Sequence, residues 1–177
     1  LETILTFPIS RKELIFGKYL AISISGIVTL LIGVFLSIVS LYYVKNSFSI
    51  YDNVIFNINT ITILLTILIL LFYTLFISGL CITIASFTKS FKEAQSALTP
   101  ISLVTCIPMF LEMLNINISG VLSFIPIINH TIVINNILTS SININNILIT
   151  IISSIIYIIV LLLFINKMYK SEKILFN

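Results

Sequence analysis

The sequence predicts an all-α fold: a polytopic membrane bundle of four transmembrane helices, preceded by a short amphipathic helix at the cytoplasmic surface. Of the 177 residues, 59% are hydrophobic and only 8% are charged, and the mean hydropathy is +1.22. Soluble domains carry about 25% charged residues because their surfaces face water. Most of this chain's surface is therefore expected to face lipid. Four long apolar segments and a one-sided distribution of cations support the same class.

The four apolar segments have the length of membrane-crossing helices. Such a helix needs about 20 mainly apolar residues, because the hydrocarbon core is about 30 Å thick and each residue rises about 1.5 Å. We predict spans at about residues 19–44, 60–87, 94–114 and 147–165.

Between the last two spans, the segment 115–146 is predicted to be an external loop. Asn and Ser alternate with Ile here, and Gly120 and Pro126 interrupt the pattern. Thr131 to Leu138 is expected to form a short helix. An interfacial and a re-entrant position both fit, since irregular backbone at membrane depth needs protein or water to satisfy its hydrogen bonds.

The basic residues predict the orientation, since Lys and Arg in short loops are retained in the cytoplasm. With both termini inside, one basic residue, Lys45, falls in an external loop. The other eight all fall on the cytoplasmic side: Arg11, Lys12, Lys18, Lys89, Lys92, Lys167, Lys170 and Lys173. The sequence therefore predicts a multi-pass protein of the plasma membrane with cytoplasmic termini.

The sequence lacks the residues that several other classes of function require. The formal net charge of +3 is too small, and the cations too scattered, for a nucleic-acid interface. Cys81 and Cys106 lie in apolar runs, where a thiol packs as a small hydrophobe, so no disulfide is predicted. His130, in a loop without other candidate ligands nearby, is expected to be hydrogen-bonded or exposed rather than a metal ligand.

Small residues form a stripe on each of the first two spans. Spacings of three and four residues place the members of each stripe on one helical face. The first stripe is Gly26, Thr29, Gly33, Ser37 and Ser40, and the second is Thr74, Ser78, Cys81 and Ala85. Such stripes let helices approach closely in lipid. A helix-packing seam and a polar lining for a transport path are both open interpretations.

The third span carries the other candidate features. Glu112 is the one acid close to the apolar body of a span, and acids at membrane depth are costly and often functional. It lies near the predicted external end, so a contact with water and a role in a substrate path are both open. Pro100 and Pro108 are expected to kink the helix, and Ser90 with Glu93 predicts a capping box at its start.

The first 18 residues predict two helices separated by a proline. Leu1 and Leu5 share one face of the first helix, which Pro8 ends. Ser10 and Glu13 then form a capping box that starts the second helix. The amphipathic first helix could lie on lipid headgroups or dock into a groove on a soluble partner, and the residues alone do not choose between these.

This opening run, Leu1-Glu2-Thr3 through Phe7-Pro8-Ile9-Ser10 to Gly17-Lys18, resembles the segment before the third spanning helix of bacterial type-two ABC transporter permeases. Within that family, Lys92-Glu93-Ala94-Gln95 followed by Pro100, and Ile125-Pro126 with Asn129, are similar to the sodium-efflux (NatB-type) branch. The resemblance covers nearly the whole chain. The chain would then be a single permease domain, the C-terminal part of a longer protein, from the coupling segment to the sixth span.

The resemblance implies a permease subunit of an ATP-driven exporter, with sodium as its substrate on the NatB-type branch. A separate cytoplasmic ATPase would bind ATP and Mg and would receive the coupling segment 1–18 in a surface groove. Glu2, Arg11 and Glu13 are assigned to this docking by their positions in the motif. A permease dimer in membrane lipid is expected, with no cofactor in this chain and no phosphate loop to hydrolyse nucleotide.

Three other classes of membrane protein are alternatives to the permease. A non-transporting assembly or anchor subunit would show the same spans and stripes. An intramembrane protease would need convergent acids and histidines, and one His with one near-membrane Glu does not provide them. A channel would need a ring of charges or a carbonyl filter, and neither is legible in the sequence.

Overall fold

The computed structural model describes residues 11–47, 59–114, 124–139 and 141–170, and these residues form helices and no strand. The helices within the described residues are α1 (Arg11–Ser47), α2 (Thr60–Ala85), α3 (Phe91–Met113), α4 (Pro126–Leu138) and α5 (Ile144–Lys170). Four contain segments long and apolar enough to cross a membrane: Glu13–Val44, Thr60–Ala85, Phe91–Leu111 and Ile144–Lys167. The predicted all-α bundle with four transmembrane helices is confirmed. The predicted amphipathic first helix lies outside the described residues.

Local hydrogen bonds explain where two of the helices begin. At α2, the Asn59 side-chain oxygen accepts from the Thr60 N–H at 2.7 Å, and the Asn59 N–H donates to the Thr62 hydroxyl at 2.9 Å. At α3, the Ser90 hydroxyl accepts from the Glu93 N–H at 3.2 Å, as the predicted capping box requires. The reciprocal bond differs from the prediction. The Glu93 carboxylate accepts at 2.9 Å from the N–H of Lys89, one residue before the cap.

Prolines act differently in α3 and α4. Pro100 and Pro108 lie inside α3, and the helix continues through both. Whether they kink it stays a prediction. Pro126 instead begins α4, at a position where its missing N–H costs no hydrogen bond. The helix therefore starts five residues before the predicted Thr131, and the expectation that His130 stands in a loop was wrong.

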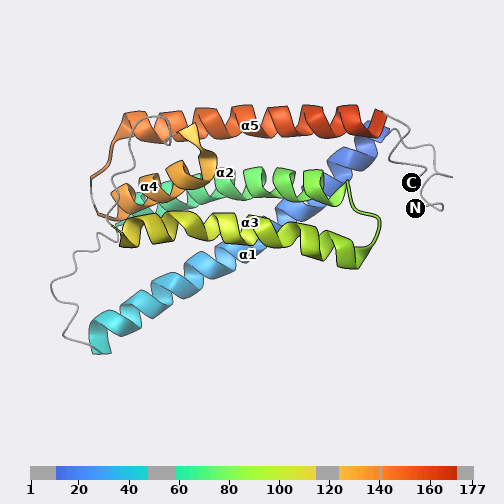
Figure 1. The fold of residues 1–177 in the computed structure, drawn as a ribbon. Coiled ribbons are helices and arrows are strands. Elements are labelled where there is room, and N and C mark those ends of the chain that lie inside the picture. The colour runs from blue at the N-terminus through green and yellow to red at the C-terminus, as the bar shows by residue number, and fades with distance from the viewer. Residues whose placement is uncertain (1–10, 48–58, 115–123, 140, 171–177) are drawn as a thin grey trace.

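α2 is the central helix, because it packs against each of the other four. α1 contacts α2 and α5 and crosses the bundle obliquely, so that its later half leaves the other helices (Figure 1). α4 lies beside α2, α3 and α5 rather than beyond their ends. α2 and α5 thus share one neighbour, α1, at one end of the bundle and another, α4, at the other end.

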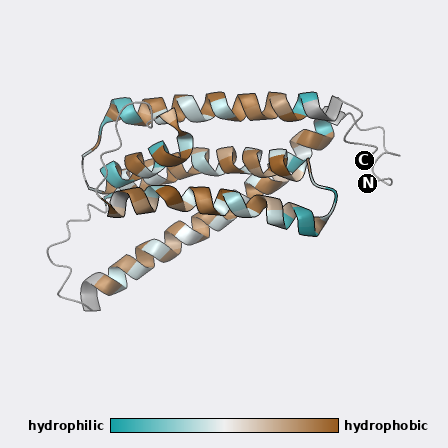
Figure 2. Ribbon diagram, in the orientation of Figure 1, coloured by the Kyte–Doolittle hydropathy of each residue, from teal (hydrophilic) through white to brown (hydrophobic). Residues whose placement is uncertain are grey.

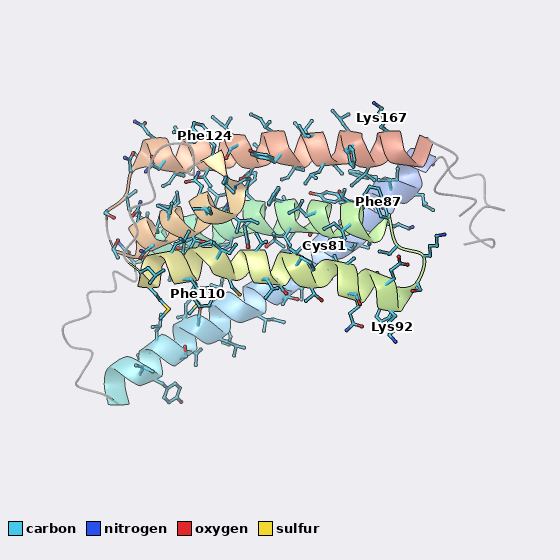
Figure 3. The ribbon with its side chains drawn as sticks, viewed as in Figure 1. Cys81, Phe87, Lys92, Phe110, Phe124 and Lys167 are labelled. Carbon is cyan, nitrogen blue, oxygen red and sulfur yellow. The ribbon has the colours of Figure 1, made fainter. Side chains whose placement is uncertain are left out.

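The two ends differ in charge. The start of α1, the α2–α3 turn and the end of α5 come together at one end (Figure 1), whereas hydrophilic residues lie at both ends (Figure 2). We call this the basic end, after its lysines Lys18, Lys89, Lys92 and Lys167; the last two are labelled in Figure 3. The opposite, far end contains the end of α1, the start of α2 and the end of α4.

Each end has its own apolar core. At the basic end, Ile15 and Tyr19 of α1 pack with Ile82 of α2 and Ile165 of α5. At the far end, Ile69 of α2 and Ile147 of α5 pack with α4, through Val133 and Ile137. The separate cores mean that α1 is anchored to the bundle at one end, and α4 at the other.

Candidate functional site

The predicted docking residues lie at or before the basic end. Glu2 is outside the described residues. Arg11 is the first residue of α1, and its side chain is not described. Glu13 lies in the first turn of α1 with an exposed side chain, where a negative charge interacts favourably with the helix N-terminus. The functional assignment of these three residues stays a prediction.

Glu13 lines an open pocket between α1 and α5 at the basic end. The pocket has a volume of about 350 Å³, and its other lining residues are Ile15, Phe16, Leu162 and Asn166. Phe16 is 55% exposed, so an aromatic ring and a carboxylate stand together at the surface. An apolar pocket with an acid at its rim can accept an apolar side chain that is accompanied by a cation.

The two small-residue stripes meet where α1 crosses α2. A Cβ added to Gly26 would stand 2.7 Å from Cγ2 of Thr74 and 3.8 Å from the Ser78 hydroxyl oxygen. The first distance is a steric overlap. Thr74 cannot turn away without cost, because its hydroxyl donates to the Leu70 carbonyl at 2.8 Å. The close approach of these two helices therefore depends on the absence of a side chain at position 26.

Beside this crossing lies an α1–α2 groove of about 340 Å³, lined by Gly26 and Thr29 of α1 and by Thr74, Ser78 and Cys81 of α2 among others. The hydroxyls of Thr29 and Ser78 donate to carbonyls of their own helices, at 2.9 and 2.8 Å. Both hydroxyl protons are thus donated to the backbone, and the hydroxyl oxygens present acceptor lone pairs to the groove. Cys81 is half-buried here, whereas Cys106 is exposed on α3, and both thiols are free.

The later part of the α1 stripe is not brought to any described helix. A Cβ at Gly33 would meet nothing within 4 Å. Ser37 and Ser40 are exposed, and each hydroxyl donates to a carbonyl three residues earlier in α1. Ala85, the last member of the α2 stripe, ends that helix. The structure therefore brings Gly26 and Thr29 to the second stripe, and leaves Gly33, Ser37 and Ser40 on the outer surface of this chain.

Glu112 lies in the last turn of α3, near the far end, and its side chain is not described. In the part of the chain that is described, no group of three His, Cys, Asp or Glu residues could hold a metal ion.

A buried polar cluster between α4 and α5 is the feature that sequence reasoning missed. The Asn129 amide donates to the Thr150 hydroxyl oxygen at 2.8 Å, and His130 Nε2 lies 3.1 Å from the Ser154 hydroxyl oxygen. All four side chains are at most 3% exposed. The spacing of four between Thr150 and Ser154 was visible as a small polar stripe on the fourth span and could have indicated a partner.

The polar cluster lies well within the bundle. Ser154 comes ten residues after Ile144, the start of α5, which corresponds to about 15 Å along a helix. α4 therefore begins beside the middle of α5 and runs back toward the far end. Tyr73 of α2 completes the surroundings, with its ring 5.2 Å from the imidazole between centroids.

Residues 1–167 match the family model described as "ABC-2 family transporter protein". No curated protein and no solved structure matches the chain.

Proposed function

Because the chain belongs to the ABC-2 family of transporter proteins, with nearly its whole length matched, we propose that it passes the work of a separate cytoplasmic ATPase to its spans and so drives the export of a substrate. The family match carries this proposal. Four helices long and apolar enough to cross the bilayer supply the membrane part. ATP and Mg would bind to the partner ATPase, and the permease would act as a dimer.

The basic end is the proposed docking face. We propose that this end faces the cytoplasm, because basic residues are retained on that side and this end carries four lysines. The pocket between α1 and α5 offers Glu13 and an exposed Phe16 to a partner. A displacement of α1 at this end would reach α2 and α5 directly, since Ile15 and Tyr19 pack against Ile82 and Ile165. Coupling requires contiguous packing of this kind.

Sodium is the proposed substrate, by the resemblance of residues 92–95, Pro100, Ile125-Pro126 and Asn129 to the NatB-type branch. The α1–α2 groove supports it chemically, because its hydroxyl oxygens act as acceptors and hard cations bind through oxygen. Glu112 would contribute an acid near the far end of the path.

The test is reconstitution of the full-length protein with its ATPase. We expect the two to co-purify and to move sodium, rather than hydrophobic drugs, into inverted vesicles when ATP is added. Co-purification without flux of any substrate would favour a non-transporting assembly subunit. Failure to bind any ATPase would refute the proposal.

Substitutions test the docking face within that assay. Arg11→Ala and Glu13→Gln should weaken ATPase binding about fivefold or more, since replacing an important interface residue costs more than about 1 kcal/mol of binding free energy. Lys45→Ala is the matched control, because it removes a charge at the opposite end of the same helix. Equal affinity in all three variants would remove these residues from the docking face.

A further inference from the structure

His130 is the one histidine of the chain, and it is enclosed between helices. Its side chain is 1% exposed and Ser154 is 0% exposed. Neither the docking face nor the α1–α2 groove uses this pair. An ionisable ring therefore lies at a position where its hydrogen bond holds α4 against α5.

The hydrogen-bond partners fix which ring nitrogen carries the proton. Nδ1 faces the carbonyl oxygen of Pro126, which can only accept, so Nδ1 must carry a hydrogen. A neutral ring then has a bare Nε2, which can only accept. The group that faces Nε2 is the Ser154 hydroxyl, at 3.1 Å.

The hydroxyl of Ser154 has one proton, and two acceptor atoms lie within reach of it. Its oxygen lies 2.5 Å from the Thr150 carbonyl oxygen as well as 3.1 Å from Nε2. When the ring is neutral, the Ser154 hydroxyl can donate to Nε2. The Thr150 carbonyl oxygen then still accepts a hydrogen bond from the Ser153 hydroxyl at 3.0 Å. When Nε2 is protonated, it donates to Ser154, which donates to Thr150. Either protonation state can therefore be hydrogen-bonded, but a Ser154 hydroxyl that donates to Nε2 must move away from the Thr150 carbonyl oxygen, because two oxygens 2.5 Å apart need a hydrogen between them.

The two states differ in charge. From α2 the ring faces Tyr73, from α5 it faces neutral hydroxyls, and the titratable group in the middle of α3 is Cys106. No acid faces the ring among the side chains that the structure describes. The nearby start of α4 carries partial positive charge on its N–H groups. Among the described side chains, a protonated ring would thus be a buried cation without a counter-ion, which is costly.

We propose that His130 is a proton-binding site, and that binding of the proton loosens α4 from α5. Both forms of the ring can be hydrogen-bonded in the packed site, but the charge of the protonated form is buried there at a cost, so packing favours the neutral ring. The ring therefore holds a proton less tightly when α4 is packed than when it is detached. By linkage, the packing of α4 against α5 is most stable at a pH where the ring is neutral, and it becomes less stable as the pH falls. This response is separate from the docking of an ATPase and does not depend on it.

The test uses the full-length protein in phosphatidylglycerol-containing nanodiscs. With ¹⁵N-histidine, the signals of His130 are identified as those that are absent from His130→Gln. At about pH 7.5 we expect the Nδ1–H tautomer, the less common form of free histidine. Hydrogen exchange of Pro126–Leu138, corrected for the intrinsic rate, should become about tenfold faster at about pH 5, a range that spans the ordinary histidine value of about 6.5.

His130→Gln is the matched variant, because its amide keeps hydrogen-bonding capacity but does not titrate. Its exchange in α4 should not respond to pH. The same pH response in His130→Gln would overturn the proposal, and so would an Nε2–H tautomer or unchanged exchange after the wild-type ring is protonated. If His130→Gln does not fold, the tautomer of the wild-type ring and the hydrogen exchange of wild-type α4 still decide whether the proposal holds.

Discussion

The two ends of the bundle are built from the same pair of helices and a different third helix. At the basic end α1 covers α2 and α5, with an apolar core and a hydrogen bond from the Tyr19 hydroxyl to the Leu75 carbonyl at 3.1 Å. At the far end α4 covers them, with an apolar core and a buried polar cluster. α2, α3 and α5 therefore connect the two ends, and each end can be perturbed separately.

The largest expected effect comes from opening a cavity in the far core. Ile69 is 0% exposed, and Ile69→Ala should lower the free energy of unfolding by about 2–5 kcal/mol. The loss should be measured by denaturation in mixed detergent micelles. Leu64→Ala is the control on the same helix, where the side chain is 62% exposed. Equal losses in the two variants would contradict a packed core at this end.

The second largest loss of stability is expected from a substitution where α1 packs against α2. Gly26→Ala would place its Cβ against Thr74, and overpacking of this kind costs about 1–3 kcal/mol. Gly33→Ala makes the same chemical change where nothing lies within 4 Å, so its stability should not fall. Both are read from thermal stability in detergent. A matching loss in Gly33→Ala would mean that the later half of α1 packs on another helix.

A smaller effect is expected from the polar cluster at the far end. Asn129→Ala and Thr150→Ala each remove one partner of a buried hydrogen bond. Bonds between membrane helices contribute about 0.6–1.7 kcal/mol. A double-mutant cycle should give a coupling free energy in that range. A coupling of zero would show that the amide and the hydroxyl do not interact.

The smallest effect should come from the hydrogen bond at the basic end. Tyr19→Phe removes the hydroxyl but keeps the ring in the apolar core, so we expect a loss of about 0.6 kcal/mol. Tyr157→Phe on α5 is the control, because that side chain is exposed. A loss larger than that of Asn129→Ala would reverse the contrast between a mainly apolar end and a polar one.

The spans could be predicted from the sequence because length and hydropathy suffice for them. α4 was predicted in part. A helix of 13 residues is marginal by itself, and it begins at Pro126 because packing on α2, α3 and α5 stabilises it. Sequence periodicity gives the face of a helix but not its neighbour. It identified Gly26 and Thr74, but it could not show that they meet or that α1 leaves the bundle before Gly33.

The orientation of the bundle underlies the proposed docking face, and cysteine labelling tests it most directly. Lys92→Cys, Lys167→Cys and Asn143→Cys would be made one at a time in a chain without Cys81 and Cys106. A membrane-impermeant maleimide should label Asn143→Cys in intact cells, and the other two only after the cells are opened. Labelling of Lys92→Cys and Lys167→Cys from opposite sides of the membrane would contradict the account.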